Sequence, residues 1–349
     1  MYQAYNGPVT IAEQPADWTE PGTHRVVSGV YRVPLPIPAA SLHAVNTYVI
    51  EDRDGLVVID PGWALPETET KLRAALAPIG HRLEDITQIL VTHAHWDHYS
   101  QALALRETFG TRVRLGRGEH VSIEALSAGR SPQQPELLRH CGASELADRV
   151  IAAHTDAPQD RDVPRREPDA WLDGGERVAL GERGLDVFDT PGHTRGHIVL
   201  RDAAAGLLFA GDHVLPHISP AIGIEPIPEP MPLRSYLASL ELVRDLPDTY
   251  LLPAHGPVTL SVHTRVDELI KHHEVRLDAS AGEVRAGAAT AYEVARALKW
   301  TRREKKLDDL DVFAQMLAVL EIAAHLDVLA DQGVLLSAEE NGVRDYSCA

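Results

Sequence analysis

Histidine and aspartate residues gather in four short motifs of this sequence. The motifs are His93-Ala94-His95-Trp96-Asp97-His98, Pro191-Gly192-His193-Thr194-Arg195-Gly196-His197, Ala210-Gly211-Asp212-His213 and Pro253-Ala254-His255-Gly256. Neutral imidazoles and carboxylates together suit a borderline divalent ion, zinc above all. A single histidine in a loop is usually structural, but four such motifs in one chain favour a metal centre. We therefore expect chemistry in which metal ions activate water.

Predicted strands lead into these motifs and must position them. The strands are Gln88–Val91, Leu185–Phe188 and Leu207–Ala210. Residues two apart at the end of a strand can point the same way. His93, His95 and Asp97 can therefore converge, while His98 opens the helix that follows.

The order of the other elements predicts an α/β fold. Further strands are expected at 23–33, 43–50, 56–59, 177–180 and 198–201, with helices at 67–76, from 102 to 109 and, interrupted at 129–135, over 119–154. An exposed connection is expected at 156–168. This order fits two βα halves around paired sheets, with helices on the outer faces.

A change of character near residue 262 predicts a catalytic domain at 1–261 and a helical domain at 262–349. Helices are expected at 266–284, 291–298 and 312–329, and a short strand at 333–336. Thr290 and Glu293 form a capping box at the start of the second helix. Three helices and a strand are the outline of a winged-helix-like module.

The overall composition indicates which partners the protein can bind and in which cellular compartment it is expected. The net charge is −18, from 33 basic and 51 acidic residues, so the surface repels nucleic-acid phosphates unless positive charge is focused locally. Neither a secretory signal nor a stretch of about 18 apolar residues is apparent, so no membrane segment is expected. Cys141 and Cys348 make no disulfide framework. We therefore expect a cytoplasmic protein.

From Val26 to Val258 the sequence resembles the metallo-β-lactamase superfamily, whose motifs it matches in identity, order and spacing. The resemblance implies an αββα sandwich with the metals at one edge. It also implies a first metal held by His93, His95 and His193, a second held by Asp97, His98 and His255, and Asp212 as the bridge between them. Asp60 matches a position that supports the site from behind by holding a ligand imidazole. The alternative for Asp60 is a turn residue at a strand end.

This ligand set implies a dinuclear metal hydrolase. Two metals about 3.5–4 Å apart share a water and lower its pKa, so that a metal-bound hydroxide attacks a thioester, ester or lactone carbonyl. Asp97 is the catalytic candidate, because its carboxylate can orient the nucleophile and hold a proton. Zinc is expected as the metal, with manganese or iron as alternatives.

Departures from the family patterns narrow the function. Asp212 stands where one group of zinc β-lactamases has a cysteine, and another lactamase group lacks this aspartate altogether. Hydrolysis of β-lactam antibiotics is therefore not expected. His95 stands where the iron-dependent redox branch has a glutamate, so oxygen reduction is not expected. A single-iron persulfide dioxygenase has similar motifs and stays an alternative. The tail resembles that of the lactamase-β-like 2 group, whose members act on RNA and whose fungal relatives are thioesterases. Residues 211–216 and 236–246 resemble glyoxalase II-like bacterial hydrolases, without the tail that binds glutathione.

Three hypotheses follow: a hydrolase of small or carrier-linked acyl compounds, a metal-dependent endoribonuclease, and a non-catalytic scaffold. The complete ligand set disfavours the scaffold. The basic residues near the motifs, Arg106, Arg195 and Arg201, are too few for a phosphate path, so the acyl hydrolase is favoured. The basic run 299–306 could contact nucleic acid, but in so acidic a chain we expect a solvated helix end.

Apolar residues after the third motif suggest where a substrate would lie. The loop 218–232 carries Ile222, Ile224, Ile227 and Met231, which suit an apolar acyl chain. The alternative is that these side chains simply pack the loop down. The apolar stripe of the helix at 312–329 also needs a partner surface, in this chain or in a homodimer.

Overall fold

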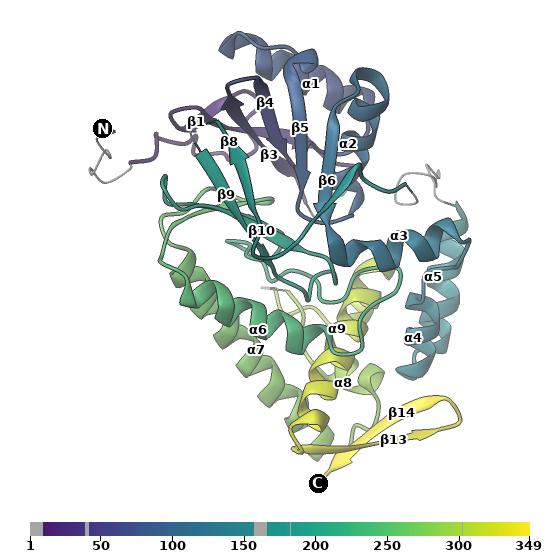
Figure 1. Cartoon of the computed structure of the whole chain (residues 1–349). Coiled ribbons are helices and arrows are strands. Elements are labelled where there is room, and N and C mark those ends of the chain that lie inside the picture. The colour runs from purple at the N-terminus through teal and green to yellow at the C-terminus, as the bar shows by residue number, and fades with distance from the viewer. Residues whose placement is uncertain (1–9, 39–41, 157–165, 182, 302) are drawn as a thin grey trace.

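Two β-sheets packed face to face, with helices on both outer faces, form the main body of the protein (Figure 1). The computed structural model describes residues 10–38, 42–156, 166–181, 183–301 and 303–349. Most of the connection predicted at 156–168 lies outside these residues. The architecture confirms the predicted α/β sandwich of two paired sheets.

The first sheet has seven strands in chain order. They are β1 (His24–Val27), β2 (Val30–Pro36), β3 (Ala44–Asp52), β4 (Gly55–Ile59), β5 (Ile86–Val91), β6 (Arg112–Gly116) and β7 (Ala170–Leu172). β1 to β4 form an antiparallel meander, whereas β4 to β7 run parallel. Parallel neighbours need crossovers, and α1 (Pro66–Leu76) and α2 (Trp96–Phe109) are the first two.

The second sheet has five strands in the order β12-β11-β10-β9-β8. They are β8 (Arg177–Leu180), β9 (Arg183–Asp189), β10 (Ile198–Asp202), β11 (Leu207–Gly211) and β12 (Tyr250–Pro253). β12 runs parallel to β11, with α6 (Pro232–Asp245) as the crossover. β6, β7 and β12 were not predicted, because their three to five residues give too short a periodic signal.

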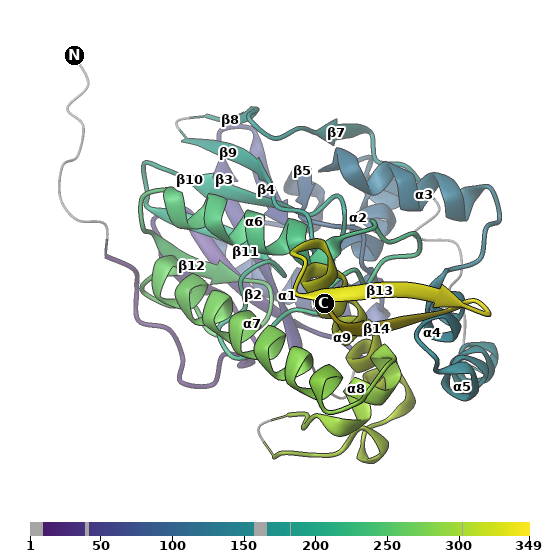
Figure 2. The same ribbon diagram turned by 90° about the horizontal axis from the view of Figure 1, so that it is seen from below.

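Apolar side chains fill the space between the sheets and beneath the helices. Tyr48 of the first sheet and Phe209 of the second meet edge to face inside the sandwich, with ring centroids 5.3 Å apart. α1 and α2 bury their apolar sides on the outer face of the first sheet. α6 and α7 (Val262–Arg285) lie side by side across the outer face of the second sheet (Figure 2).

The carboxyl ends of several strands meet at one edge of the sandwich. β4 and β5 are parallel in the first sheet, and β11 and β12 are parallel in the second. Backbone hydrogen bonds join these ends, from Asp60 N–H to the Leu90 carbonyl and from Ala254 N–H to the Gly211 carbonyl. Another, from Asn46 N–H to the Ala254 carbonyl, ties the two sheets together. All four motifs therefore arrive at the same edge.

The helical part of the chain extends beyond the C-terminal segment. It comprises α3 (His120–Ser127), α4 (Gln134–His140), α5 (Ser144–Asp156), α7, α8 (Ala291–Ala297), α9 (Val312–Asp331) and the hairpin of β13 (Leu335–Glu340) and β14 (Val343–Cys348). The capping box of Thr290 and Glu293 is confirmed at α8. α4 and α5 share one apolar core with α8 and α9, so this core crosses the predicted boundary at 261/262.

α9 corrects the expectation that no apolar segment reaches membrane-spanning length. Its 20 residues have a mean hydropathy of 1.7 over 18 residues, which suffices by length and composition. However, 56% of that window is buried inside the protein, where α9 packs against α4 to α8. α9 is therefore the central helix of the helical part, and packing on all sides accounts for its apolar composition.

Candidate metal centre

The four motifs bring seven side chains together in two adjacent groups. The first group is His93, His95, His193 and Asp212, and the second group is Asp97, His98 and His255. Within each group, the candidate ligand atoms lie within 4.8 Å of one another. The structure therefore assembles every ligand candidate named from the sequence.

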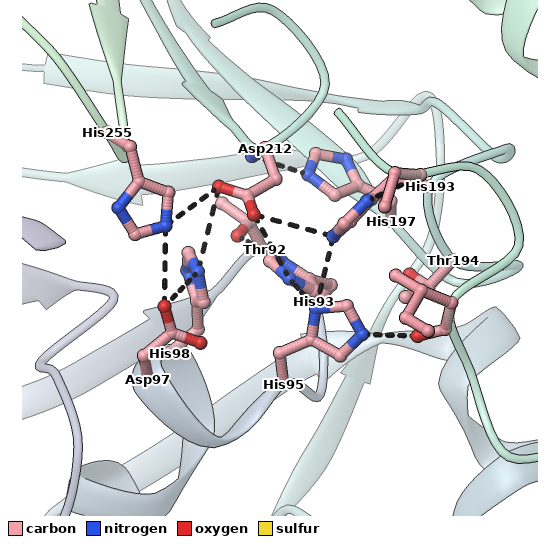
Figure 3. A network of polar contacts seen from close by, with 12 residues as sticks. Thr92, His93, His95, Asp97, His98, His193, Thr194, His197, Asp212 and His255 are labelled. Atoms are coloured by element: carbon pink, nitrogen blue, oxygen red, sulfur yellow. Dashed lines mark hydrogen bonds and ion pairs between the residues drawn. The ribbon is translucent and has the colours of Figure 1, made fainter. Parts of the chain in front are cut away.

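Asp212 faces both groups with different oxygens (Figure 3). Its Oδ2 lies 3.4 Å from His193 Nε2 and 4.0 Å from His93 Nε2. Its Oδ1 lies 3.4 Å from His255 Nε2 and 3.7 Å from His98 Nε2. One carboxylate is thus placed to contact an ion in each group.

Hydrogen bonds on the outside of the first group orient its imidazoles. His193 donates from Nδ1 to the Ala221 carbonyl at 2.6 Å, and His95 donates from Nε2 to the Ile224 carbonyl. Because a carbonyl only accepts, the proton of each ring must lie on this outer nitrogen. The inner nitrogens, His193 Nε2 and His95 Nδ1, lie 3.1 Å apart and keep their lone pairs for an ion.

The second group is oriented in the same way. His255 donates from Nδ1 to the Ala44 carbonyl at 2.7 Å, and His98 donates from Nδ1 to Asp60 Oδ2 at 2.9 Å. Asp97 Oδ2 lies 3.3 Å from His255 Nε2 and 3.6 Å from His98 Nε2. The inner nitrogens and the carboxylate oxygen therefore converge on one point.

Asp60 lies behind the second group and does not face its interior. Its backbone has a left-handed φ of 49°, which aspartate tolerates better than most residues. Its buried carboxylate accepts hydrogen bonds from Thr92 N–H at 2.8 Å and from the Thr92 hydroxyl at 2.7 Å, besides the one from His98. Asp60 thus fixes a ligand-candidate imidazole and the strand end that carries the first motif.

His197 and Gly211 position Asp212, a role that the sequence reasoning missed. His197 Nε2 accepts a hydrogen bond from Asp212 N–H at 3.1 Å, and its Nδ1 contacts the Thr190 hydroxyl at 2.9 Å. Gly211 has a φ of 51°, and a Cβ there would lie 2.7 Å from His197 Nε2 and from Thr92 Oγ1. Only glycine fits this approach. The available signal was that His197 closes the second motif.

Electrostatics differ between the two groups. Burial, and then the neighbouring imidazoles, lower the pKa of His93 well below its usual value and that of His193 to about 4. Burial also lowers the pKa of His98, but Asp97, Asp60 and Asp212 outweigh it and raise this pKa to about 10. The first group thus offers neutral imidazoles, and the second concentrates negative charge that a cation would neutralise.

Unpaired polar atoms show that these residues fit metal ions. His98 Nε2, His255 Nε2 and Asp212 Oδ1 are buried without a hydrogen-bond partner among the described residues. Leaving such an atom unsatisfied costs about 1–3 kcal/mol. A divalent cation would satisfy all three, and the nitrogen and oxygen donors are those that such ions take in proteins.

The apolar residues of loop 218–232 lie mainly in the core. Ile222 is 5% exposed and packs with the side chains of α6 and α7, and Met231 packs against the same cluster. Ile224 packs against the core of the helical part. Ile222 also lines a cavity of about 290 Å³ between this loop, α4 and α9. This packing accounts for the apolar character of the three residues; Ile227 is only partly buried, and its carbonyl accepts a hydrogen bond from Arg195.

Comparison with known proteins agrees with this geometry. Residues 40–255 match the family model of the metallo-beta-lactamase superfamily. The probable metallo-hydrolase YqjP of Bacillus subtilis is 26% identical over 324 residues, which cover 88% of this chain and 93% of that protein. The hydroxyacylglutathione hydrolase of Cereibacter sphaeroides is 31% identical over 181 residues, 52% of each chain.

A solved structure extends the similarity to nearly the whole chain. The crystal structure of a beta-lactamase domain protein from Burkholderia ambifaria superposes with a TM-score of 0.80 at 27% identity. The match covers 96% of this chain and 97% of that one, so it includes the helical part. The family match spans well over half of the chain and contains every motif of the centre. The chain therefore belongs to the metallo-beta-lactamase superfamily and is a metal-dependent hydrolase.

Proposed function

We propose that this hydrolase cleaves a thioester, ester or lactone at a centre of two metal ions. The first ion would be held by His93, His95 and His193. The second ion would be held by Asp97, His98 and His255. Asp212 would contact both ions. The observation that carries the proposal is the placement of Asp212, whose two oxygens face the two groups at 3.4 Å each. Asp60 and Thr92 would act behind the ligands, by fixing the His98 and His93 rings.

Metal ions bound there would supply Lewis acidity, which lowers the pKa of a bound water and polarises the carbonyl oxygen of a substrate. The side chains of the protein direct the reaction. Asp97 is the one carboxylate of the second group, and we assign it the orientation of the attacking water and the acceptance of its proton. The water oxygen bonds to the carbonyl carbon, the carbon–sulfur or carbon–oxygen bond breaks, and the proton passes from Asp97 to the leaving thiol or alcohol.

We propose zinc as the metal. Zinc takes imidazole nitrogen and carboxylate oxygen, and catalytic zinc sites keep a position open for water. The seven candidates comprise five histidines and two aspartates, which suits zinc better than magnesium or calcium. Metal analysis of protein purified without chelator decides between zinc and the alternatives, manganese and iron.

The charges around the centre favour an acyl substrate over RNA. Each phosphate contact of an RNA enzyme normally uses a lysine or arginine near the strand. Arg195 donates to the Ile227 carbonyl at 3.1 Å, and Arg106 donates to the Glu167 carbonyl and lies 3.6 Å from Asp169. The guanidinium groups of Arg195 and Arg106 are therefore engaged in contacts within the protein, which disfavours a role in binding RNA phosphates. The name of the Cereibacter relative, which specifies an acyl group on glutathione, also supports an acyl substrate.

The helical part offers little for nucleic acid. α7, α8, α9 and β13 follow the predicted order of three helices and a strand. β14, which was not predicted, pairs with β13, and its Asp345 pairs with Thr290. We propose that residues 262–349 form a winged-helix-like module, whose apolar core is shared with α4 and α5. However, α9 contains no lysine or arginine and is largely buried. Trp300, in the basic run, is buried under Arg276 and donates to the Ala295 carbonyl.

We also propose a cytoplasmic homodimer. Cys141 is buried and Cys348 exposed, and both are free thiols, as expected in a reducing compartment. The helical part exposes the large apolar side chains of Val275, Phe313 and Leu336. Sedimentation velocity at micromolar concentration tests the dimer, and a monomer at all concentrations would exclude it.

A substrate panel tests the proposed function. Metal-loaded protein is assayed on acyl thioesters, acyl esters, lactones and a short single-stranded RNA at several salt concentrations. We expect hydrolysis of at least one carbonyl class that depends little on salt, and its loss in an Asp212→Asn variant. RNA cleavage that weakens steeply with salt, without carbonyl hydrolysis, would overturn the proposal.

A further inference from the structure

A small cavity borders the metal centre at His95. Its volume is about 80 Å³. Its apolar walls are formed by Ala94, Trp96, Ile123, Leu126 and Pro226. Ile123 and Leu126 of α3 are 1% and 8% exposed and close one side of the cavity. The cavity therefore lies beside the reacting centre and is closed by buried aliphatic side chains.

The polar side chains of this cavity are committed to one another. The Thr194 hydroxyl donates to Glu119, and the Ser122 hydroxyl donates to Glu225 Oε2 at 2.8 Å. His95 donates its outer N–H to a backbone carbonyl. Because these groups already have partners, a ligand in the cavity meets mainly apolar surface. A polar group placed there would lose its hydrogen bonds to water without replacement.

The two buried carboxyls add little charge to the cavity. Glu119 is 1% exposed and Glu225 is 2% exposed. Burial, and then the neighbouring Glu225, raise the pKa of Glu119 to about 8, and burial raises the pKa of Glu225 to about 7. Near neutral pH Glu119 is therefore largely protonated, and Glu225 is about half ionised. The two groups together carry less charge than two ordinary carboxylates, and their oxygens already accept hydrogen bonds from Thr194 and Ser122.

Two stacked tryptophans lie near the first motif, and one of them lines the cavity. Trp96 lines the cavity and stands between His95 and Asp97 in the first motif. Its ring stacks on Trp63, with centroids 6.0 Å apart and an interplanar angle of 23°. Both rings are only partly buried. Trp96 thus adds a partly exposed aromatic surface to the wall of the cavity.

The size of the cavity limits what it can hold. At about 30 Å³ for a water-sized group, 80 Å³ accommodates about three such groups. We propose that this cavity binds the hydrocarbon end of a short acyl group of about two to four carbons, and that Leu126 and Ile123 set its length. This inference rests on the proposed hydrolysis of a carbonyl compound.

The position of the cavity indicates which end of the substrate enters it. The leaving thiol or alcohol of a carrier-linked substrate is large and needs an open route, which this small cavity does not provide. A short acyl chain in the cavity would place its carbonyl beside His95, a member of the first group. The cavity would thus select substrates by the length of the acyl chain and set no limit on the size of the leaving group.

The larger cavity behind loop 218–232 is the competing acyl site. Its volume is about 290 Å³, and Leu137 and Ile222 line it. The loop backbone lies between it and the ligands, because Gly223 N–H donates to the Gly192 carbonyl and Ile224 N–H donates to the His193 carbonyl. An acyl chain there would have to displace this loop to reach the centre. Leu137→Ala is therefore a matched control for Leu126→Ala.

The test measures chain-length preference in the metal-loaded enzyme. Thioesters of one thiol with acyl chains of two to ten carbons are compared by kcat/KM. The wild type should prefer chains of two to four carbons. Leu126→Ala should move the optimum to longer chains, with a gain of roughly four-fold for each methylene newly accommodated. Leu137→Ala should leave the optimum where it is.

Binding of product carboxylates provides a readout that does not depend on turnover. Calorimetry of the same proteins with acetate, butyrate, hexanoate and octanoate should show tightest binding for the short acids, and a shift to longer acids in Leu126→Ala. A Leu126→Phe variant, which fills the cavity, should weaken butyrate binding. Thermal unfolding of each variant shows whether it is folded.

The possible outcomes separate the two proposals. If no carbonyl compound is hydrolysed, the proposed function fails, while carboxylate binding still reports on the cavity. If hydrolysis occurs but long chains are preferred by the wild type, or Leu137→Ala shifts the optimum and Leu126→Ala does not, the assignment of this cavity is overturned. A wild-type preference for short chains that only Leu126→Ala relaxes supports it.

Discussion

Replacing Asp60 by asparagine tests whether a residue outside the ligand groups controls the second metal site. The amide keeps the size of the carboxylate but has one acceptor oxygen and one NH₂ donor. Asp60 Oδ1 accepts from Thr92 N–H at 2.8 Å, and Oδ2 accepts from the Thr92 hydroxyl at 2.7 Å and from His98 at 2.9 Å. In Asp60→Asn, at least one of these donors must therefore face the NH₂ group.

The structure sets the size of the expected effect. One buried donor left unsatisfied costs about 1–3 kcal/mol. If this cost appears at the His98 ring, the affinity for the second metal should fall about 10–100-fold, which is the usual range for partners behind a metal ligand. The hydrogen bonds of the described residues connect the first group to Asp60 through the Thr92 hydroxyl, which contacts His93 Nδ1 at 3.1 Å. Its affinity for metal should therefore change less.

Competition with a metal-sensitive chelator measures both affinities in one titration. The matched control is Asp54→Asn, an exposed aspartate in the turn between β3 and β4, at the opposite end of β4. The control should titrate like the wild type. If Asp60→Asn binds both metals as tightly as the control, or loses the first before the second, the role assigned to Asp60 is wrong.

Three further predictions follow from the centre and the core. Elemental analysis should find two metal ions per chain, since two ligand groups share Asp212; a value of one that metal supplementation does not raise would refute the dinuclear centre. Asp212→Ala should lower kcat more than Asp60→Ala at saturating metal, because Asp212 alone faces both groups; the reverse order would mean that the roles are exchanged. Burial lowers the pKa of His273 to about 2 and of His325 to about 3, so both stay neutral in the folded protein while the unfolded chain takes up protons below about pH 6.5. As the pH falls from 6.5 to 4.5, the free energy of unfolding should therefore decrease by up to about 1.4 kcal/mol per histidine and pH unit. Denaturant titrations of His273→Phe should show a smaller decrease with pH than those of the wild type. An equal decrease in both proteins would contradict this role of His273.

The helical part shows where local patterns mislead. The sequence places a boundary at 261/262, because the residue pattern changes from strands to helices there. In the folded protein, Leu138 of α4 and Val150 of α5 pack in one core with Val294 and Ile322 of α8 and α9. No periodicity reveals this contact, because each helix shows only that it has an apolar side and not which surface covers it. Removing residues 262–349 would therefore expose this core.

The apolar residues near the third motif are a similar case. Ile222 and Met231 fit an acyl chain by type, but in the structure they pack beneath α6 and α7. The small cavity beside His95 is built instead from α3, the first motif and Pro226, which are far apart in the sequence. Hydrophobicity alone does not distinguish a pocket wall from a core position, because both exclude water.

The ligand candidates and most of the elements that carry them could be predicted from the sequence. His93, His95 and Asp97 follow a strand at a spacing that few other functions would require, and strand periodicity is a local property of the chain. The tertiary structure decided which atoms face which group, how Asp212 divides its oxygens, and that His197 holds its backbone. Such relations also join segments that are far apart in the chain, such as those carrying Ala44 and His255. They depend on how two sheets pack and on where each buried polar atom finds a partner, which no local pattern specifies.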